Sequence, residues 1–164
     1  MEKVGVLFVC LGNICRSPMA EAIFNHKIQQ FGIEHRFIVD SCGTGNYHIG
    51  QQPDPRTVSS ARRNGVPISH ACRQLQAKDL LEFDYILAMD ASNLSNILKL
   101  PNASDYAGKI MLMREFDPKG KGSEVPDPYF GGEDGFQEVF EILDRTMVNF
   151  IEHLGRTHSG INKD

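Results

Sequence analysis

The chain is organised around one stretch, Val9-Cys10-Leu11-Gly12-Asn13-Ile14-Cys15-Arg16-Ser17-Pro18. It follows an apolar, β-branched run over residues 4–9, which is typical of a buried strand. After Pro18, apolar residues recur at spacings of three and four, as on one helix face: Ala20, Ile23, Phe24, Ile28 and Phe31. The stretch is therefore predicted to be a loop that ends on a helix N-terminus, where unpaired backbone N–H groups and the helix dipole favour an anion.

The residues of this loop suit a tetrahedral anion with a nucleophile beneath it. Gly12 and Asn13 tolerate the left-handed backbone that a tight loop needs. Five residues separate Cys10 from Arg16, so a loop closed around one anion would bring the thiol below it and the planar guanidinium beside it. The amide dipoles, the helix N-terminus and Arg16 favour the thiolate form of the sulfur. Ser17 either donates its hydroxyl to that sulfur or serves only as a helix cap.

The bulk composition indicates one globular domain. The chain has 164 residues, of which 41% are hydrophobic and 23% charged, and its formal charge of −4 gives no support to a nucleic-acid partner. No stretch has the length of a membrane span or the features of a signal peptide, so we expect a cytoplasmic protein that does not bind membranes. The cysteines lack paired zinc spacing, and reduced thiols without a metal or cofactor are expected at Cys10, Cys15, Cys42 and Cys72.

Strand and helix patterns alternate along the chain and predict a single α/β domain. Strands are expected at residues 4–9, 36–41, 83–89 and 109–113, the last at a sheet edge. A long final helix carries one apolar face made of Phe136, Phe140, Leu143, Met147, Phe150 and Leu154. We predict an open, mostly parallel four-stranded sheet in the flavodoxin-like order 2-1-3-4, with helices on both faces. Residues 1–157 are assigned to this domain and residues 158–164 to a flexible tail.

A second group of chemically active residues lies in a long loop over residues 114–135. It contains Val125-Pro126-Asp127-Pro128-Tyr129-Phe130, in which the prolines restrict the backbone around the aspartate. An ordinary turn could use the same residues, but cleavage of a phosphate ester needs an acid that protonates the leaving oxygen. Tyr129 would line the mouth of the site, and Tyr47 either forms a cleft wall or covers a neighbouring loop.

The string from Cys10 to Pro18 closely resembles the signature of low-molecular-weight protein tyrosine phosphatases, and the resemblance extends along most of the chain. It implies a metal-independent hydrolase with Cys10 as nucleophile and Asp127 as general acid and base. It also implies activity as an acid phosphatase on aryl phosphates, phosphotyrosine proteins as partners, inhibition by phosphate or vanadate, and a monomer or weak dimer. The implied phosphate-binding residues are Leu11, Gly12, Asn13, Ile14, Cys15, Arg16 and Ser17.

The resemblance also implies supporting roles for residues outside the loop. Ser41 and His70 would hold Asn13 in its left-handed shape, although a lone histidine is often only a hydrogen-bonded residue. Asp90 would orient Arg16, unless helix capping alone explains it. The implied substrate cleft consists of Ile14, Tyr47, Tyr129 and Phe130, with tyrosine at 47 where the family often has tryptophan and phenylalanine at 130 where many members have tyrosine.

Three other functions use a similar scaffold or loop. Arsenate reductases need further cysteines downstream, and none follows Cys72. Arginine phosphatases tend to have threonine at the position of Ile14, where isoleucine favours a flat aromatic ring. A noncatalytic phosphopeptide-binding module would need neither thiolate nor acid. Cys15 is a hypothetical redox partner that captures oxidised Cys10 as a disulfide, or else a small residue that fills space behind the loop.

Overall fold

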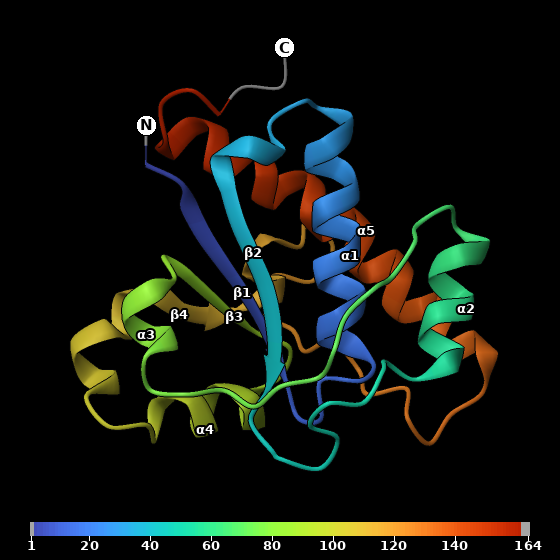
Figure 1. The fold of residues 1–164 in the computed structure, drawn as a ribbon. Helices are drawn as coiled ribbons and strands as arrows, with labels where there is room; N and C mark the ends of the chain where they lie inside the picture. The colour runs from blue at the N-terminus through green and yellow to red at the C-terminus, as the bar shows by residue number, and fades with distance from the viewer. Residues whose placement is uncertain (1, 162–164) are drawn as a thin grey trace.

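A computed structural model describes residues 2–161 (Figure 1). Its sheet contains the strands β1 (Val4–Cys10), β2 (Phe37–Gly43), β3 (Tyr85–Ala88) and β4 (Ile110–Leu112). The strand order is β2-β1-β3-β4, and each neighbouring pair is parallel. The predicted α/β fold and its strand order are confirmed, and the sheet is wholly rather than mostly parallel. Because β1 pairs with β2 on one side and β3 on the other, the order reverses at the carboxyl end of β1, where open α/β sheets bind ligands.

The longer helices are α1 (Arg16–Gln30), α2 (Pro55–Arg63), α4 (Ala91–Leu98) and α5 (Glu133–Thr157). Shorter helical segments are α3 (Asp79–Glu82), η1 (Glu34–Arg36), η2 (Ala103–Lys109) and η3 (Met113–Phe116). Helices α1 and α5 pack together on one face of the sheet, with α2 against α5, and α4 packs on the other face (Figure 1). None of the helices in residues 2–161 is both long enough and apolar enough to cross a membrane.

The core forms on both faces because every residue of β1 is buried and its side chains alternate. Phe8 packs on one face with Phe24 of α1 and Phe150 of α5. Val9 packs on the other face with Ile97 of α4. The strand is thereby fixed from both sides, and its last residue, Cys10, is held at the carboxyl edge of the sheet.

Element boundaries differ from the predicted ones where neighbouring segments supply hydrogen bonds. Strand β2 continues to Gly43 because this residue bonds to the segment after His70. The Gly43 N–H donates to the Arg73 carbonyl, and the Gly43 carbonyl accepts from the Leu75 N–H. Strand β3 starts only at Tyr85, since the N–H of Phe83 bonds back to α3.

The chain after α5 returns toward the sheet. The Tyr85 hydroxyl lies 2.8 Å from Nε2 of His158, and Ile161 is buried. The flexibility expected of residues 158–164 stays a prediction, and residues 162–164 lie outside the described part of the chain.

Candidate active site

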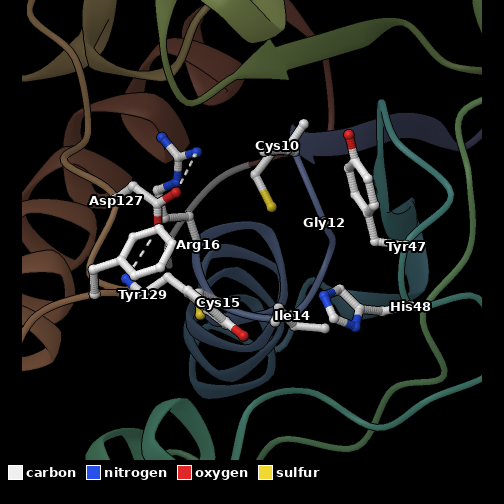
Figure 2. A pocket seen from close by; sticks show the side chains of 11 residues that line it. Cys10, Gly12, Ile14, Cys15, Arg16, Tyr47, His48, Asp127 and Tyr129 are labelled. Atoms are coloured by element: carbon white, nitrogen blue, oxygen red, sulfur yellow. Dashed lines mark hydrogen bonds and ion pairs between the residues drawn. The ribbon is translucent and has the colours of Figure 1, made fainter.

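The loop after β1 wraps around the sulfur of Cys10. The Sγ atom lies 3.0 Å from Oγ of Ser17 and accepts a hydrogen bond from the Asn13 backbone N–H at 3.3 Å. Figure 2 shows the sulfur pointing into the middle of the pocket, near the first turn of α1. Ser17 is the second residue of α1, whereas Cys15 occupies the N-cap position, so the reading of Ser17 as the helix cap is wrong.

Asn13 gives the loop its shape. Its backbone has a φ of 58°, in the left-handed region that few residues other than glycine adopt. Its Nδ2 donates to the hydroxyls of Ser17 and Ser41 at 2.8 and 3.0 Å. Its Oδ1 lies 2.7 Å from Nε2 of His70 and accepts from the Arg73 N–H at 3.0 Å. Segments from three parts of the chain therefore hold this one buried amide.

Arg16 joins the loop after β1 to two further segments. The side chain is 3% exposed, and its Nη1 donates to Oδ2 of Asp90 at 2.7 Å and to the carbonyl of Val125 at 3.0 Å. Its Nη2 lies 3.7 Å from Oδ2 of Asp127. Asp90 also caps α4 in a capping box with Asn93, so both contacts considered for this aspartate are present. The guanidinium is thereby fixed beside the Cys10 loop.

A pocket of about 320 Å³ opens above the sulfur. In Figure 2, Tyr47 and His48 stand on one side of it, and Asp127 and Tyr129 on the other. Asp127 is partly exposed at the rim. All four residues predicted for the cleft line this pocket, namely Ile14, Tyr47, Tyr129 and Phe130. The walls are mostly apolar or aromatic, with Cys10 and Arg16 at the base and Asp127 at the rim.

Cys15 lines the same pocket as Cys10, and its surroundings disfavour the charged form of its thiol. Burial raises the pKa of the Cys15 thiol to about 12, with a lowering contribution from a hydrogen bond to Thr57 and raising contributions from nearby Asp54, Cys10 and Asp127. The thiol of Cys15 is therefore neutral near pH 7. Its role as redox partner of Cys10 stays a prediction.

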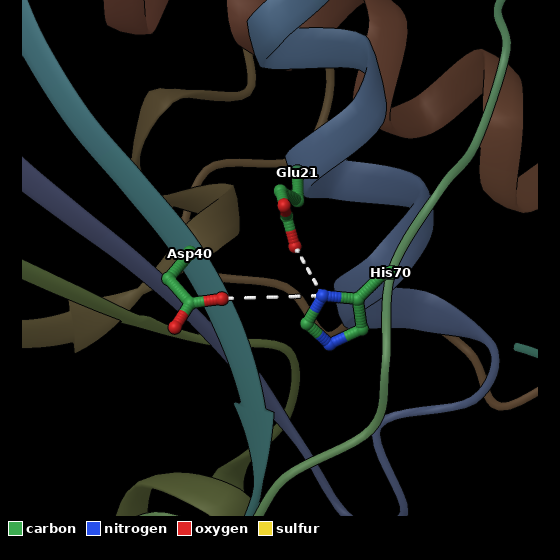
Figure 3. Close-up of side chains that lie close together, drawn as sticks. All are labelled: Glu21, Asp40 and His70. Carbon is green, nitrogen blue, oxygen red and sulfur yellow. Dashed lines mark ion pairs between the residues drawn. The ribbon is translucent and has the colours of Figure 1, made fainter. Parts of the chain in front are cut away.

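Behind the loop, three side chains from separate elements point toward one another (Figure 3). Nδ1 of His70 lies 3.2 Å from Oε1 of Glu21 and 3.9 Å from Oδ1 of Asp40. Within residues 2–161 this is the one group of histidine, cysteine and acidic atoms close enough to share a metal ion. Each carboxylate already accepts a protein hydrogen bond, from Ser41 Oγ to Glu21 and from Arg73 Nε to Asp40. We therefore assign the group to the support of the loop.

Sequence reasoning missed several contributors to the site. Cys72 donates its thiol to the Asn13 carbonyl at 2.8 Å, and Arg73 holds Asp40 and Asp79 as well as Asn13. His48 lines the pocket beside Tyr47. These residues reach the loop through tertiary folding and stand in no recognisable local motif. For Cys72, the one signal in the sequence is its position two residues after His70, for which the resemblance implies a contact with Asn13.

Comparison with known proteins identifies the family. The family model for low molecular weight phosphotyrosine protein phosphatases matches residues 5–159. The chain belongs to this family. A low molecular weight phosphotyrosine protein phosphatase of Schizosaccharomyces pombe is 46% identical over 154 residues, covering 93% of this chain and 98% of the relative.

Solved structures of phosphatases share the fold. The crystal structure of a protein tyrosine phosphatase from Entamoeba histolytica, with Hepes in its active site, has a TM-score of 0.89 and 42% identity. That match covers 94% of this chain and 98% of the other. A Drosophila arginine phosphatase has a TM-score of 0.83 and 31% identity over 93% of this chain and 99% of its own. The fold thus occurs in phosphatases of more than one specificity.

Proposed function

We propose that this chain is a protein-tyrosine phosphatase that hydrolyses aryl phosphate monoesters through a cysteinyl phosphate. The observation that carries the proposal is the placement of the Cys10 sulfur at the base of a pocket, within 3.3 Å of the Asn13 N–H, with Arg16 beside it. Asp127 stands at the rim of the same pocket, 3.7 Å from Arg16. Membership of the family supports phosphoproteins as the substrate class.

In the first step, the Cys10 thiolate attacks phosphorus and an S–P bond forms while the bond from phosphorus to the aryl oxygen breaks. The backbone N–H groups of residues 11–17 and the Arg16 guanidinium bind the equatorial oxygens, and hold them best in the transition state. Asp127 gives its proton to the departing aryl oxygen. The hydroxyl of Ser17, 3.0 Å from the sulfur, stabilises the thiolate.

In the second step, a water molecule attacks the phosphorus of the cysteinyl phosphate. The Asp127 carboxylate takes a proton from this water, the S–P bond breaks, and inorganic phosphate leaves with the thiolate restored. Arg16 and the loop amides supply the positive potential in both steps. We therefore propose a metal-independent reaction that phosphate and vanadate inhibit by occupying the loop.

The pocket favours an aryl group over a guanidinium group as the bearer of the phosphate. Its walls include Ile14, Tyr47 and Tyr129, which offer apolar and aromatic surface for a flat ring. Acidic residues of this pocket are limited, among the residues described as lining it, to Asp127. A guanidinium would need more carboxylate partners than this wall offers, so arginine phosphate is the weaker candidate.

The test is hydrolysis of 4-nitrophenyl phosphate in the presence of a metal chelator, with and without vanadate. We expect vanadate-sensitive turnover, none in Cys10→Ser, and a loss of about a hundredfold or more in Asp127→Ala. A stoichiometric burst of nitrophenol separates covalent catalysis from noncatalytic phosphopeptide binding. Undiminished turnover by Cys10→Ser would remove the nucleophile from the proposal.

Phosphoproteins trapped from a lysate by Asp127→Ala would identify substrates. We expect them to carry phosphotyrosine. Capture that is insensitive to vanadate would contradict binding through the phosphate loop.

A further inference from the structure

Arg56, the second residue of α2, has an exposed side chain whose guanidinium is nevertheless held firmly. Its Nε and Nη2 donate to the two carboxylate oxygens of Asp54 at 3.1 and 2.9 Å. Two parallel hydrogen bonds between a planar guanidinium and a carboxylate fix the orientation of both groups. This leaves the edge formed by Nη1 and the second N–H of Nη2 for other acceptors.

That edge meets the loop that carries Asp127. Nη2 of Arg56 donates to the carbonyl of Tyr129 at 2.9 Å, and Nη1 donates to the carbonyl of Gly131 at 3.4 Å. Its Cζ lies 5.5 Å from the ring centroid of Tyr129 and 4.8 Å from that of Phe136, in the first turn of α5. Such stacking adds a cation–π attraction. One side chain therefore connects the start of α2 to the loop and to α5.

Both ends of this connection lead into the active site. The backbone N–H of Asp54 donates to the carbonyl of Ile14, in the phosphate loop, at 2.8 Å. At the other end, the backbone N–H of Tyr129 donates to Oδ1 of Asp127 at 3.1 Å. A continuous path of direct contacts thus runs from the phosphate loop through Asp54, Arg56 and Tyr129 to the Asp127 carboxyl group.

Besides Arg56, the segment from Asp127 onward is attached through the buried Pro128 and through the 3.7 Å contact between Asp127 and Arg16. Before Asp127, the chain is fixed at Val125, whose N–H bonds to Met89 and whose C=O accepts from Arg16. After Asp127, the Phe130 side chain is 95% exposed and contributes little buried apolar surface. Segments with little burial open easily unless polar contacts hold them.

We propose that Arg56 is a positioning residue that holds Asp127 in place for proton transfer to the leaving group. It acts through Asp127 and Tyr129 and does not itself touch the reacting atoms. This inference rests on the proposed function, because it needs Asp127 to be the acid. Losing the contact lets the carboxyl group move, and displacements near 1 Å are enough to slow a positioned reaction about a hundredfold.

The experiment compares two substrates that differ in their need for a proton. Phenyl phosphate releases a basic phenoxide and depends on the acid, whereas 2,4-dinitrophenyl phosphate releases a stable anion and does not. The measured quantity is the ratio of kcat/KM for the second substrate to that for the first. In Arg56→Met, which keeps an apolar stem for the aromatic rings and removes the hydrogen bonds, we expect this ratio to rise about tenfold or more.

Two variants control for effects on folding. Arg63→Met removes an exposed arginine of the same helix that lines the same groove as Arg56, and its ratio should stay within about twofold of wild type. Asp54→Asn keeps a good helix cap but breaks the paired bonds to Arg56, and its ratio should rise in the same direction as that of Arg56→Met. A ratio in Arg56→Met equal to that in Arg63→Met would overturn the proposal.

A double variant tests whether Arg56 acts through Asp127. In an Asp127→Asn background, Arg56→Met should leave the ratio unchanged, because the acid whose position it controls is already gone. The same rise in both backgrounds would show that Arg56 acts by another route and would overturn the proposal. If the proposed function fails, Asp127→Asn alone leaves the wild-type ratio unaltered, which distinguishes that failure from the failure of the positioning role.

Discussion

Asp117 offers a quantitative test of what stabilises the loop segment that precedes Asp127. Its buried carboxylate accepts hydrogen bonds from Nε and Nη2 of Arg145 at 2.9 and 3.0 Å, from the Lys119 N–H at 2.9 Å and from Nε of Arg114 at 2.8 Å. Burial alone would raise the pKa of Asp117, but these donors outweigh it and lower the pKa from 3.8 to about 2. Folding therefore favours the charged form.

The size of the effect follows from this shift in the pKa of Asp117. A difference of nearly two units at about 1.4 kcal/mol each gives roughly 2 kcal/mol of stabilisation. Since the pKa is lower in the folded state, this stabilisation is complete above the unfolded pKa of 3.8 and is lost as the pH falls through about 2. We expect Asp117→Asn to lower the free energy of unfolding at pH 7 by about 2 kcal/mol and the Tm by about 4–8 °C.

Urea unfolding followed by circular dichroism between pH 2 and pH 7 measures this difference. The matched control is Asp144→Asn, whose carboxylate is 47% exposed and pairs with Lys27 at 2.9 Å. That variant should cost less than about 1 kcal/mol. The reasoning fails if Asp117→Asn costs no more than the control, or if its cost is the same at pH 2 and pH 7.

Three further predictions concern the phosphate loop. The free energy of unfolding measured in urea should be about 1 kcal/mol lower for Asn13→Ala than for Asn13→Gly, because alanine resists the φ of 58°. Equal free energies would contradict this. Iodoacetamide at pH 7.5 should modify Cys10 before Cys15, whose pKa is raised to about 12, as peptide mass spectrometry would show; earlier labelling of Cys15 would argue against it. Ile14→Thr should lower kcat/KM for aryl phosphate about tenfold relative to arginine phosphate, and an unchanged preference would remove Ile14 from substrate selection.

The core of the fold was predictable because its signals are local. The apolar run of β1, the glycine and asparagine after it and the periodic face of α1 follow one another without interruption in the sequence. The capping residue Asp90 likewise stands at the start of a helix, α4. Short-range physics sets these features, so a single sequence is enough to find them.

The parts that escaped prediction depend on contacts between distant segments. Cys72 and Arg73 reach Asn13 from nearly sixty residues away, and Arg56 reaches Tyr129 from a separate helix. Ser17 was ambiguous because a serine near a helix start suits a cap equally well, and only the start of α1 at Arg16 decides between the two roles. Tertiary geometry determines these contacts, and no local sequence pattern predicts them.

The hydrogen bonds around Asn13 carry a consequence for how this protein could be dissected. A peptide spanning β1 and α1 contains the loop that would bind the phosphate. It lacks Ser41, His70 and Arg73, which hold Asn13 in its left-handed conformation. The conformation of the loop therefore depends on the folded domain, and we expect the excised or transplanted segment to lose it. We expect partial unfolding that releases β2 or the chain around His70 to abolish activity while the other helices are still folded.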